Sequence, residues 1–455
     1  MKKTVVFYFL IFATFLNCKQ KTNLEKEENL SIKESALISK LEFEAKDNLL
    51  YKWYPLVLDS IDGGYFSDVT YDFKIGEHHT KMIVTQARHI WVNSKAALIY
   101  NDTLYRDYAK HGFEFLKNKM WDTKNGGFFN FVEKNGTPIL QRGQEKTTYG
   151  NAFAIYGLAA YYAASQNEEA LEYAKKTFFW LEEHSHDNNL KGYFQTMNID
   201  GSLLKRPENE PSTSDIGYKD QNSSIHLLEA FSELYKVWPD KLLKERLEEL
   251  LFLIRDTIVT EKGYMNLFFL DDWTPVSFKN TSKENIQKHY YLNHVSFGHD
   301  IEIAYLLLEA SHVLGNKNDT ITLQKAKLLV DHTVKNGIDK KVGGLYDGGY
   351  YYQNEDTISI INDKKNWWAQ TEALNSLLIM NHYFPNDEMN YKAEFDKLWE
   401  YTKTYFIDDE FGGWYEWGID KTPESKTALK GHVWKSTYHN FRALINCIDT
   451  LKKSN

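Results

Sequence analysis

Gly63-Gly64-Tyr65 is the first of six copies of a glycine-aromatic turn that recur along the chain. The other copies are Gly126-Gly127-Phe128, Lys191-Gly192-Tyr193, Lys262-Gly263-Tyr264, Gly343-Gly344-Leu345-Tyr346 and Gly412-Gly413-Trp414-Tyr415. Counted between their last glycines, successive copies lie 63, 65, 71, 81 and 69 residues apart. Glycines can form a pattern by chance, but the same alternation of helical segments fills every interval. The period therefore indicates one supersecondary unit copied six times.

Helical periodicity begins near Ile32 and alternates with these turns to the end of the chain. The even-numbered helices carry small and apolar residues on most faces, as in 151–160, which suits burial on nearly all sides. The odd-numbered helices are amphipathic and charged, as in 240–249. The sequence therefore predicts an all-α fold, an (α/α)6 barrel of six inner and six outer helices. We expect these twelve helices at roughly 33–54, 80–101, 104–120, 148–165, 167–185, 221–237, 240–258, 296–314, 320–337, 366–384, 388–405 and 437–452.

Each glycine turn lies between an outer helix and the next inner helix. Glycine supplies the backbone freedom of a tight turn, and Tyr, Phe and Trp favour strands, so we expect short β-hairpins here. The hairpins would gather at the end of the barrel where the inner helices begin. We expect that end to hold the functional site, within a single catalytic domain formed by residues 33–455.

Composition and charge narrow the functional classes. The net charge of −9 leaves no electrostatic footprint for nucleic acid. Cys18 and Cys447 are the only cysteines, so a disulfide framework and a cysteine-based zinc site are both implausible. Aromatic residues make up 15% of the chain, which suits a cleft that stacks on sugar rings, although most of these rings must fill the core.

The first residues have the pattern of a targeting segment, with a basic start and an apolar run over 5–16 that is short for a membrane span. Residues 1–18 resemble a bacterial lipoprotein signal peptide, in which Cys18 would be lipidated. Asn17 departs from the usual small residue at that position, so an ordinary secretory signal is the alternative. Residues 19–32 would form a flexible tether. The expected location is the periplasm or cell surface, lipid-anchored to a bacterial membrane, with secretion as the alternative.

Polar side chains interrupt the apolar pattern near the amino ends of five inner helices. Pairs spaced three or four residues apart lie on one helix face. A single histidine on an apolar helix is usually a core residue, but three at matching depth, each with a polar neighbour one turn away, favour a common site. The residues are Arg88 and Trp91, Asn222 and His226, His299 and Glu302, Trp367, Trp368 and Glu372, and His439 and Arg442.

These residue types suit proton transfer next to a carbonyl group, as in an opened aldose. Two imidazoles on opposite faces of a substrate can remove and return a carbon-bound proton, and an arginine can stabilise the enediolate that forms. Glu302, one turn from His299, would orient that imidazole and raise its basicity. The competing interpretation is a metal site formed by His226, His299, His439 and Glu302.

Five motifs resemble the N-acylglucosamine 2-epimerase superfamily, and within it most of all the cellobiose 2-epimerase branch. The resemblance runs from about residue 40 to 450 and implies an (α/α)6 barrel that needs no cofactor. The motifs are Arg88-His-Ile-Trp91, Asn222-Ser-Ser-Ile-His226-Leu-Leu-Glu-Ala230, Phe297-Gly-His-Asp-Ile-Glu302, Trp367-Trp-Ala-Gln-Thr-Glu-Ala373 and Trp434-Lys-Ser-Thr-Tyr-His439-Asn-Phe-Arg442.

The resemblance also implies roles for individual residues. His299 and His439 would exchange the C2 proton, each on one face of a cis-enediolate, and His226 would help to open the pyranose ring. Arg88 and Asn222 would hold sugar oxygens, and Glu302 and Glu372 would orient histidines or sugar hydroxyls. Trp367, Trp368 and Trp434 would stack on sugar rings. Arg442 and Tyr149 are further expected contacts, and the alternative for Tyr149 is a structural role.

The sequence therefore predicts an isomerase that epimerises the reducing-end sugar of a β-1,4-linked disaccharide, of the cellobiose or mannobiose type, at C2. An aldose–ketose isomerase acting on mannose would use the same enediolate. A glycoside hydrolase would need a carboxyl pair chosen from Asp300, Glu302 and Glu372. A carbohydrate-binding lipoprotein without turnover would retain the tryptophans but would not need the histidines. The oligomeric state is not predicted.

Overall fold

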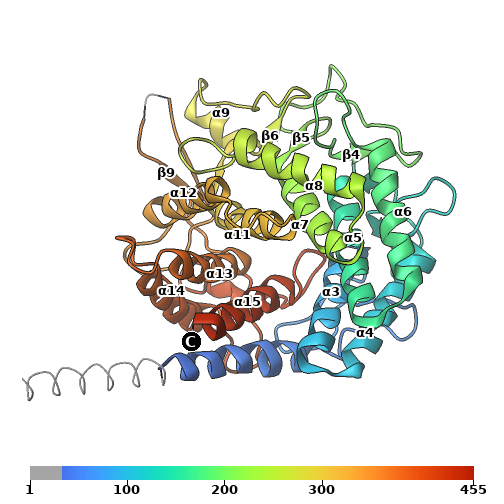
Figure 1. The fold of residues 1–455 in the computed structure, drawn as a ribbon, viewed down its shortest axis with the longest axis horizontal. Helices are drawn as coiled ribbons and strands as arrows, with labels where there is room; N and C mark the ends of the chain where they lie inside the picture. Colours follow the sequence, from blue (N-terminus) through green and yellow to red (C-terminus); the bar gives the residue numbers. More distant parts are fainter. Residues whose placement is uncertain (1–32, 354, 455) are drawn as a thin grey trace, which may run out of the picture.

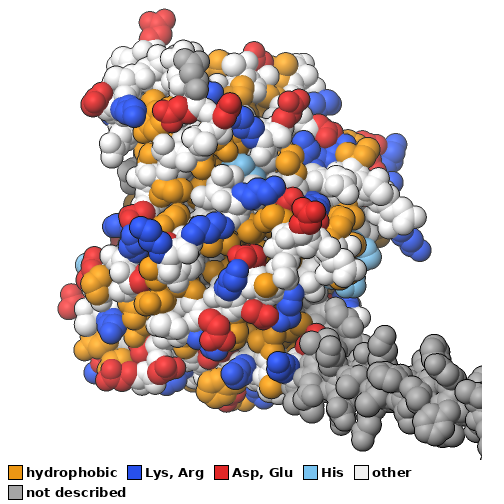
Figure 2. All heavy atoms as spheres, turned by 90° about the vertical axis from the view of Figure 1, so that its left-hand side faces the viewer, with side chains coloured by type: hydrophobic (Ala, Val, Ile, Leu, Met, Phe, Trp, Pro, Cys, Tyr) orange, Lys and Arg blue, Asp and Glu red, His pale blue; other side chains and the backbone are white. Residues whose placement is uncertain are grey.

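The computed structural model describes residues 33–353 and 355–454, and Figure 1 shows their path. The predicted signal peptide, Cys18 and the tether 19–32 lie outside the described residues. In the part of the chain that is described, no helix is long and apolar enough to cross a membrane. Cys447 is buried and unpaired. On the face in Figure 2, basic and acidic side chains are interspersed, without a continuous basic surface.

The twelve predicted helices are present, and they alternate between an inner and an outer layer (Figure 1). The inner helices are α3 (Ile83–Tyr100), α5 (Thr148–Ser165), α7 (Gln221–Val237), α11 (Phe297–Val313), α13 (Trp367–Tyr383) and α15 (Tyr438–Ser454). The outer helices are residues 33–53, which include η1 (Glu44–Leu50) and α2 (Tyr51–Trp53), then α4 (Thr103–Phe115), α6 (Glu168–His184), α8 (Lys241–Leu253), α12 (Thr320–Asn336) and α14 (Tyr391–Tyr405).

The inner helices pack side by side in chain order, and α15 returns to contact α3, so the ring is closed. The outer helices α4, α6, α8, α12 and α14 each pack against the inner helix that precedes them, and α15 packs against η1 in the first outer helix. Small residues allow the close approach of inner helices. A side chain at Gly157 in α5 would lie 2.7 Å from the backbone oxygen of Ala87 in α3.

Short antiparallel strands connect neighbouring repeats at the amino ends of the inner helices. In each of the first four repeats, the strand that leads into an inner helix pairs with a strand of the following repeat. The register includes Lys81 opposite Val132 and Lys146 opposite Met197. The pairs are β1 (Lys81–Met82) with β2 (Phe131–Val132), β3 (Lys146–Thr147) with β4 (Thr196–Met197), β5 (Lys219–Asp220) with β6 (Phe268–Phe269), and β7 (Val295–Ser296) with β8 (Gly348–Tyr350), which also pairs with β9 (Ser359–Asn362).

The glycine turns form the expected hairpins. In all six repeats an isolated bridge closes the turn, as between Leu58 and Tyr65. Gly64 has a φ of +70°, and a side chain there would lie 2.6 Å from Oε1 of Gln86 on α3. Gln86 holds the turn by accepting from the Tyr65 amide at 2.8 Å and donating to its carbonyl at 2.8 Å. The turn therefore requires glycine for its conformation and for its contact with the inner helix.

The sequence analysis missed a buried Asp–Lys ion pair that recurs beneath these turns. Four lysines, each two residues before an inner helix, contact an aspartate of the preceding hairpin and a backbone carbonyl of its turn. The pairs are Lys81–Asp59 at 2.8 Å, Lys146–Asp122 at 2.7 Å, Lys219–Asp187 at 2.8 Å and Lys365–Asp339 at 3.0 Å. In the sixth repeat Lys430 pairs with Asp408 at 2.6 Å. In the fourth repeat Thr260 and Val295 replace both partners.

The longest interval between turns holds two short helices that the sequence analysis did not predict. They are α9 (Lys283–Lys288) and α10 (Tyr290–Asn293), and they lie just before β7. Other differences are π-helical turns at the ends of outer helices, η2 (Leu116–Met120) and η3 (Ile254–Ile258), and a 3-10 turn, η4 (Pro423–Thr427). These segments leave the expected helical layers unchanged.

Candidate active site

The predicted side chains converge on one cavity of about 210 Å³ at the amino ends of the inner helices. Three further predicted residues do not line the cavity: Glu372 and Arg442, with exposed fractions of 0% and 1%, and Trp91, which stacks on Tyr156. The ten residues that line it are Arg88, Tyr149, Asn222, His226, His299, Glu302, Trp367, Trp368, Trp434 and His439, and all ten belong to the set predicted from the sequence. The predicted residues therefore meet at the end of the barrel where the inner helices begin.

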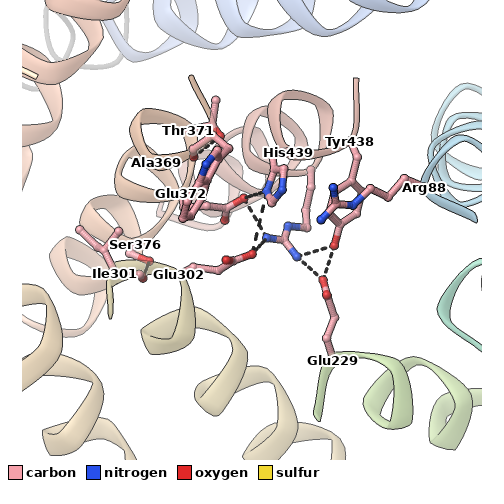
Figure 3. A network of polar contacts seen from close by, with 12 residues as sticks. Arg88, Glu229, Ile301, Glu302, Ala369, Thr371, Glu372, Ser376, Tyr438 and His439 are labelled. Carbon is pink, nitrogen blue, oxygen red and sulfur yellow. Dashed lines mark hydrogen bonds and ion pairs between the residues drawn. The ribbon is translucent and has the colours of Figure 1, made fainter. Parts of the chain in front are cut away.

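His439 on α15 is hydrogen-bonded through Nδ1 to Oε1 of Glu372 on α13, at 2.8 Å (Figure 3). With the carboxylate as acceptor, Nδ1 carries the proton and Nε2 keeps its lone pair. Burial lowers the pKa of His439 well below its usual range, and the Arg88 guanidinium lowers it further. The ring is therefore neutral near neutral pH, with a lone pair on Nε2.

His299 on α11 has a different partner from the one predicted. Its Nδ1 lies 2.8 Å from Oγ of Ser296, the residue before the helix. Glu302 instead contacts Arg442, and its Oε1 lies 4.0 Å from Nδ1 of His439. The prediction that Glu302 orients His299 is thus corrected, because the Glu302 carboxylate is held by the Arg442 guanidinium. Burial lowers the pKa of His299 to about 3, and the neighbouring histidines His226, His294 and His439 contribute.

His226 on α7 pairs through Nδ1 with Oε2 of Glu229, one turn further along the same helix, at 2.9 Å. The other oxygen of Glu229 accepts from the Tyr438 hydroxyl and from Arg442 (Figure 3). Burial acts to raise the pKa of Glu229, but Arg442 and His226 together hold it well below its usual range. Glu229 is therefore a buried carboxylate that orients His226.

Arg442 on α15 is the centre of the polar cluster beneath the cavity. It contacts Glu229, Glu302 and Glu372, the last at 2.8 Å. Arg442 is buried, contacts these three carboxylates and does not line the cavity, and its predicted contact with substrate stays a prediction. Burial raises the pKa of Glu372, although Arg442 opposes this shift.

Arg88 on α3 is the cation that does line the cavity. It donates to the Tyr149 hydroxyl at 3.1 Å and to the backbone oxygen of Trp434 at 3.4 Å. Its guanidinium carbon lies 4.4 Å from the ring centroid of Phe153 and 5.0 Å from that of Tyr438. Its Nε is buried without a partner, so Arg88 retains a donor for a ligand.

Trp368 lies between the two histidines predicted to exchange a proton. Its ring centroid is 4.8 Å from that of His299 and 5.7 Å from that of His439. Trp434 forms the rim, with 47% of its surface exposed. Asn222 adds a buried Oδ1 that has no protein partner. The cavity thus combines aromatic surfaces with free polar atoms, as carbohydrate sites do.

A second hollow of about 220 Å³ continues the cavity outward. The two share Tyr149, Asn222, His299 and Trp434. Asp215 and Tyr291 lie further out, and the Tyr291 ring is 59% exposed. The combined cleft therefore extends well beyond the histidines.

Sequence reasoning missed three residues that act on the histidines: Ser296, Glu229 and Tyr438. Glu229 had a detectable signal, because it follows His226 by three residues on an apolar helix, in the spacing that links His299 to Glu302. Tyr438 precedes His439 and resembles an ordinary core aromatic. Ser296 precedes its helix, and no periodic pattern marks it.

The geometry bears on two alternative interpretations. Among the described residues, the side chains close enough together to hold a metal ion are Glu302, Glu372 and His439, and not the three histidines of the predicted metal site. The Arg442 guanidinium already contacts both of these carboxylates. Asp300, a candidate for hydrolysis, accepts from the backbone amide of Met265 at 2.8 Å and does not line the cavity. Of the three carboxyl groups considered for hydrolysis, Glu302 lines the cavity, whereas Asp300 and Glu372 do not.

The sequence and the fold of this chain were compared with those of known proteins. The chain matches the family N-acylglucosamine 2-epimerase (GlcNAc 2-epimerase) over residues 64–443. The chain belongs to this family. A family relative, the cellobiose 2-epimerase of Bacteroides fragilis, is 27% identical over 91% of this chain and 98% of its own length. Another, the D-mannose isomerase of Marinomonas mediterranea, is 25% identical over 88% of this chain and 94% of its own.

Solved structures of the N-acylglucosamine 2-epimerase family share this fold. The cellobiose 2-epimerase of Spirochaeta thermophila superposes with a TM-score of 0.79 at 28% identity, covering 93% of this chain and 99% of that one. The predicted (α/α)6 barrel and the family resemblance are both confirmed.

Proposed function

We propose that the protein is a carbohydrate 2-epimerase that interconverts glucose and mannose at the reducing end of β-1,4-linked disaccharides. The observation that carries the proposal is the pair His299 and His439, two neutral imidazoles from different inner helices that contact the same Trp368 ring in one cavity. Both rings have Nδ1 hydrogen-bonded within the protein. Each can therefore offer Nε2 to a substrate.

In the proposed reaction, one imidazole removes the C2 proton of the opened sugar, leaving a cis-enediolate. Rotation about C2–C3 then presents the other face to the second imidazole. That ring, which takes up a proton from solvent at Nε2 before this step, returns the proton to C2, and the first ring releases the proton it removed to solvent after the turnover. Arg88 supports the developing negative charge on oxygen, because it is a buried cation that lines the cavity. His226, oriented by Glu229, assists opening of the ring. The sugar undergoes no net oxidation or reduction, so the reaction needs no redox cofactor.

The length of the cleft favours a disaccharide over a single sugar. Trp434 lies where the inner cavity meets the outer hollow. A sugar ring linked to the reducing-end residue would pass Trp434 and enter that hollow. An aldose–ketose isomerase acting on mannose is the second candidate, since relatives of both kinds match the chain. It would return the proton to C1 and would leave the outer hollow unused.

Deuterium incorporation tests the proposal. The purified protein is incubated with mannobiose, cellobiose or mannose in D2O containing EDTA, and products are followed by NMR. We expect deuterium at C2 and the epimeric disaccharide. A ketose would assign an isomerase, and released monosaccharide a hydrolase. Exchange that occurs only after metal is restored would identify the histidines as metal ligands.

We further propose that residues 1–18 direct export and that Cys18 anchors the protein to a bacterial membrane through lipid. The pattern of residues 5–18 supports this proposal. Expression of Cys18→Ser in a bacterial host tests it. The variant should move from the membrane fraction to the soluble fraction, while a wild-type protein that is already soluble would argue for an ordinary secretory signal.

A further inference from the structure

His226 and His439 are connected by an unbroken chain of buried polar contacts, and Figure 3 shows the part that runs from Glu229 to His439. The chain runs from His226 to Glu229, from Glu229 to Arg442, and from Arg442 through Glu372 to His439. The Tyr438 hydroxyl strengthens its centre by donating to Glu229 and accepting from Arg442 at 2.6 Å. His299 stands outside it, because its Nδ1 partner is Ser296.

The charges in this cluster do not balance. Glu229, Glu302 and Glu372 are carboxylates in contact with one guanidinium, that of Arg442. Arg88 is the second cation, and its guanidinium carbon lies 5.0 Å from the Tyr438 ring. With uncharged imidazoles, three negative charges face two positive ones. An uncompensated charge is costly in a buried cluster, so the cluster favours one additional proton.

The surroundings offer few other places for that proton. Every inner helix contributes to the environment of Arg442. The charged and titratable groups are Arg88 on α3, Tyr149 and Tyr156 on α5, His226 and Glu229 on α7, His299, Glu302 and Tyr305 on α11, Glu372 on α13, and Tyr438, His439 and Cys447 on α15. Burial raises the pKa of the Cys447 thiol, which therefore stays neutral. Burial raises the pKa of the tyrosines, which therefore stay neutral. The additional proton belongs to one of the two imidazole–carboxylate pairs.

We propose that Arg442 is the shared counter-ion of these two pairs, so that a proton on His226 disfavours a proton on His439 and the reverse. When His226 is charged, Glu229 is compensated locally, and the guanidinium serves Glu302 and Glu372. When His226 is neutral, Glu229 competes for Arg442, and Glu372 then favours a proton on His439. Arg442 is thus a positioning residue that couples two steps. Ring opening at His226 and C2 proton transfer at His439 would share a single proton.

The role of this proton in catalysis rests on the proposed function, but the coupling between the two histidines does not. The coupling can therefore be tested without a sugar. The full chain is labelled with 15N-histidine, and the protonation of the His226 and His439 rings is followed by NMR against pH. Assignments come from His226→Asn and His439→Asn. In Glu372→Gln, one competitor for Arg442 is lost, and we expect the pH midpoint of the His226 ring to fall by about one unit, a typical effect of a neighbouring charge. In Glu229→Gln, the competitor of Glu372 for Arg442 is lost, so the pH midpoint of the His439 ring should fall as well.

Glu233→Gln is the matched control, because Glu233 is a buried carboxylate one turn beyond Glu229 and pairs with Lys95 and Lys236 outside the cluster. It should leave both rings unchanged. If Glu372→Gln does not fold, Glu302→Gln removes another carboxylate from Arg442 and should shift His226 in the same direction. An unchanged His226 titration in folded Glu372→Gln or Glu302→Gln would overturn the proposal, as would an equal shift in Glu233→Gln. Failure of epimerase activity would leave this result intact.

Discussion

At the scale of single residues, the site depends on what each imidazole meets at Nδ1. His226 and His439 meet carboxylates, whereas His299 meets a hydroxyl. Outside the cavity, His89 meets the Tyr54 hydroxyl at 2.7 Å and stacks on Tyr65. Histidines of the candidate site and of the core therefore lie on the same ring of helices, and a hydroxyl partner occurs in both settings, at His299 and at His89.

His89 makes stability sensitive to acid. Burial lowers its pKa to about 3, whereas in the unfolded chain it is about 6.5. Between these values the unfolded state binds the additional proton, so the free energy of unfolding is highest above pH 6.5 and falls as the pH is lowered. His89→Gln keeps an acceptor for Tyr54 and should reduce the loss between pH 7 and 5 by about 2 kcal/mol. Urea unfolding at pH 7 and pH 5 measures the free energy of unfolding of both proteins. An equal loss of this free energy in the wild type and in His89→Gln would contradict the expectation.

Trp434 should contribute to substrate binding through stacking at the rim. Trp434→Ala is expected to raise KM for a disaccharide about tenfold, which corresponds to about 1.4 kcal/mol, with a smaller change in kcat. Steady-state kinetics at saturating and at limiting sugar concentrations separate the change in kcat from the change in KM. Tyr383→Ala is the control, because that ring is 50% exposed at the far end of α13. An unaltered KM in Trp434→Ala would remove Trp434 from the substrate site.

At the scale of the elements, the recurring unit is a hairpin joined to an inner helix. The helix side chain holds the turn, as Gln86 holds Tyr65, and the lysine before the helix reaches into the same turn. The fourth repeat shows that the ion pair is dispensable when both partners change together, since Thr260 and Val295 leave no buried charge. This agrees with the general cost of removing only one member of a buried pair.

The first repeat allows a direct comparison. Lys81→Met leaves Asp59 buried and should destabilise the protein by about 3 to 5 kcal/mol. Replacing both partners as in the fourth repeat, with Asp59→Thr and Lys81→Val, should recover at least half of that loss. Urea unfolding followed by tryptophan fluorescence measures the three proteins. A double variant less stable than Lys81→Met would show that the pair stabilises the hairpin in a way that the fourth repeat does not reproduce.

At the scale of the whole molecule, the ring is closed by contacts between α15 and α3. An open array of repeats can lose its ends separately, but a closed ring has no free end repeat. We therefore expect a single unfolding transition, with coincident midpoints by far-UV circular dichroism and tryptophan fluorescence. Lys81→Met in the first repeat and Lys365→Met in the fifth should each shift that whole transition. Two separated transitions would indicate that part of the ring unfolds independently.

Much of this architecture could be predicted from the chain, because period and amphipathicity are local properties. Predicted boundaries differed where another contact intervened: the helix expected at 80–101 begins at Ile83, since Lys81 and Met82 form β1. The cavity-lining residues stood out as polar residues on apolar helices. Glu372 and Arg442 stood out for the same reason but do not line the cavity. The depth of a residue within the ring decides this, and sequence does not encode that depth locally. The Asp–Lys pairs span 22 to 32 residues, so no helical or strand period reveals them.

The unequal partners of His299 and His439 have a consequence for isotope effects. The final ratio of the two epimers is fixed by the sugars, so a difference in basicity between the two rings cannot change it. It can change which of the two proton transfers is slower. With C2-deuterated substrate, the two directions of reaction should therefore be slowed to different degrees. Exchanging the Ser296 hydroxyl for a carboxylate with Ser296→Asp should bring the two isotope effects closer together.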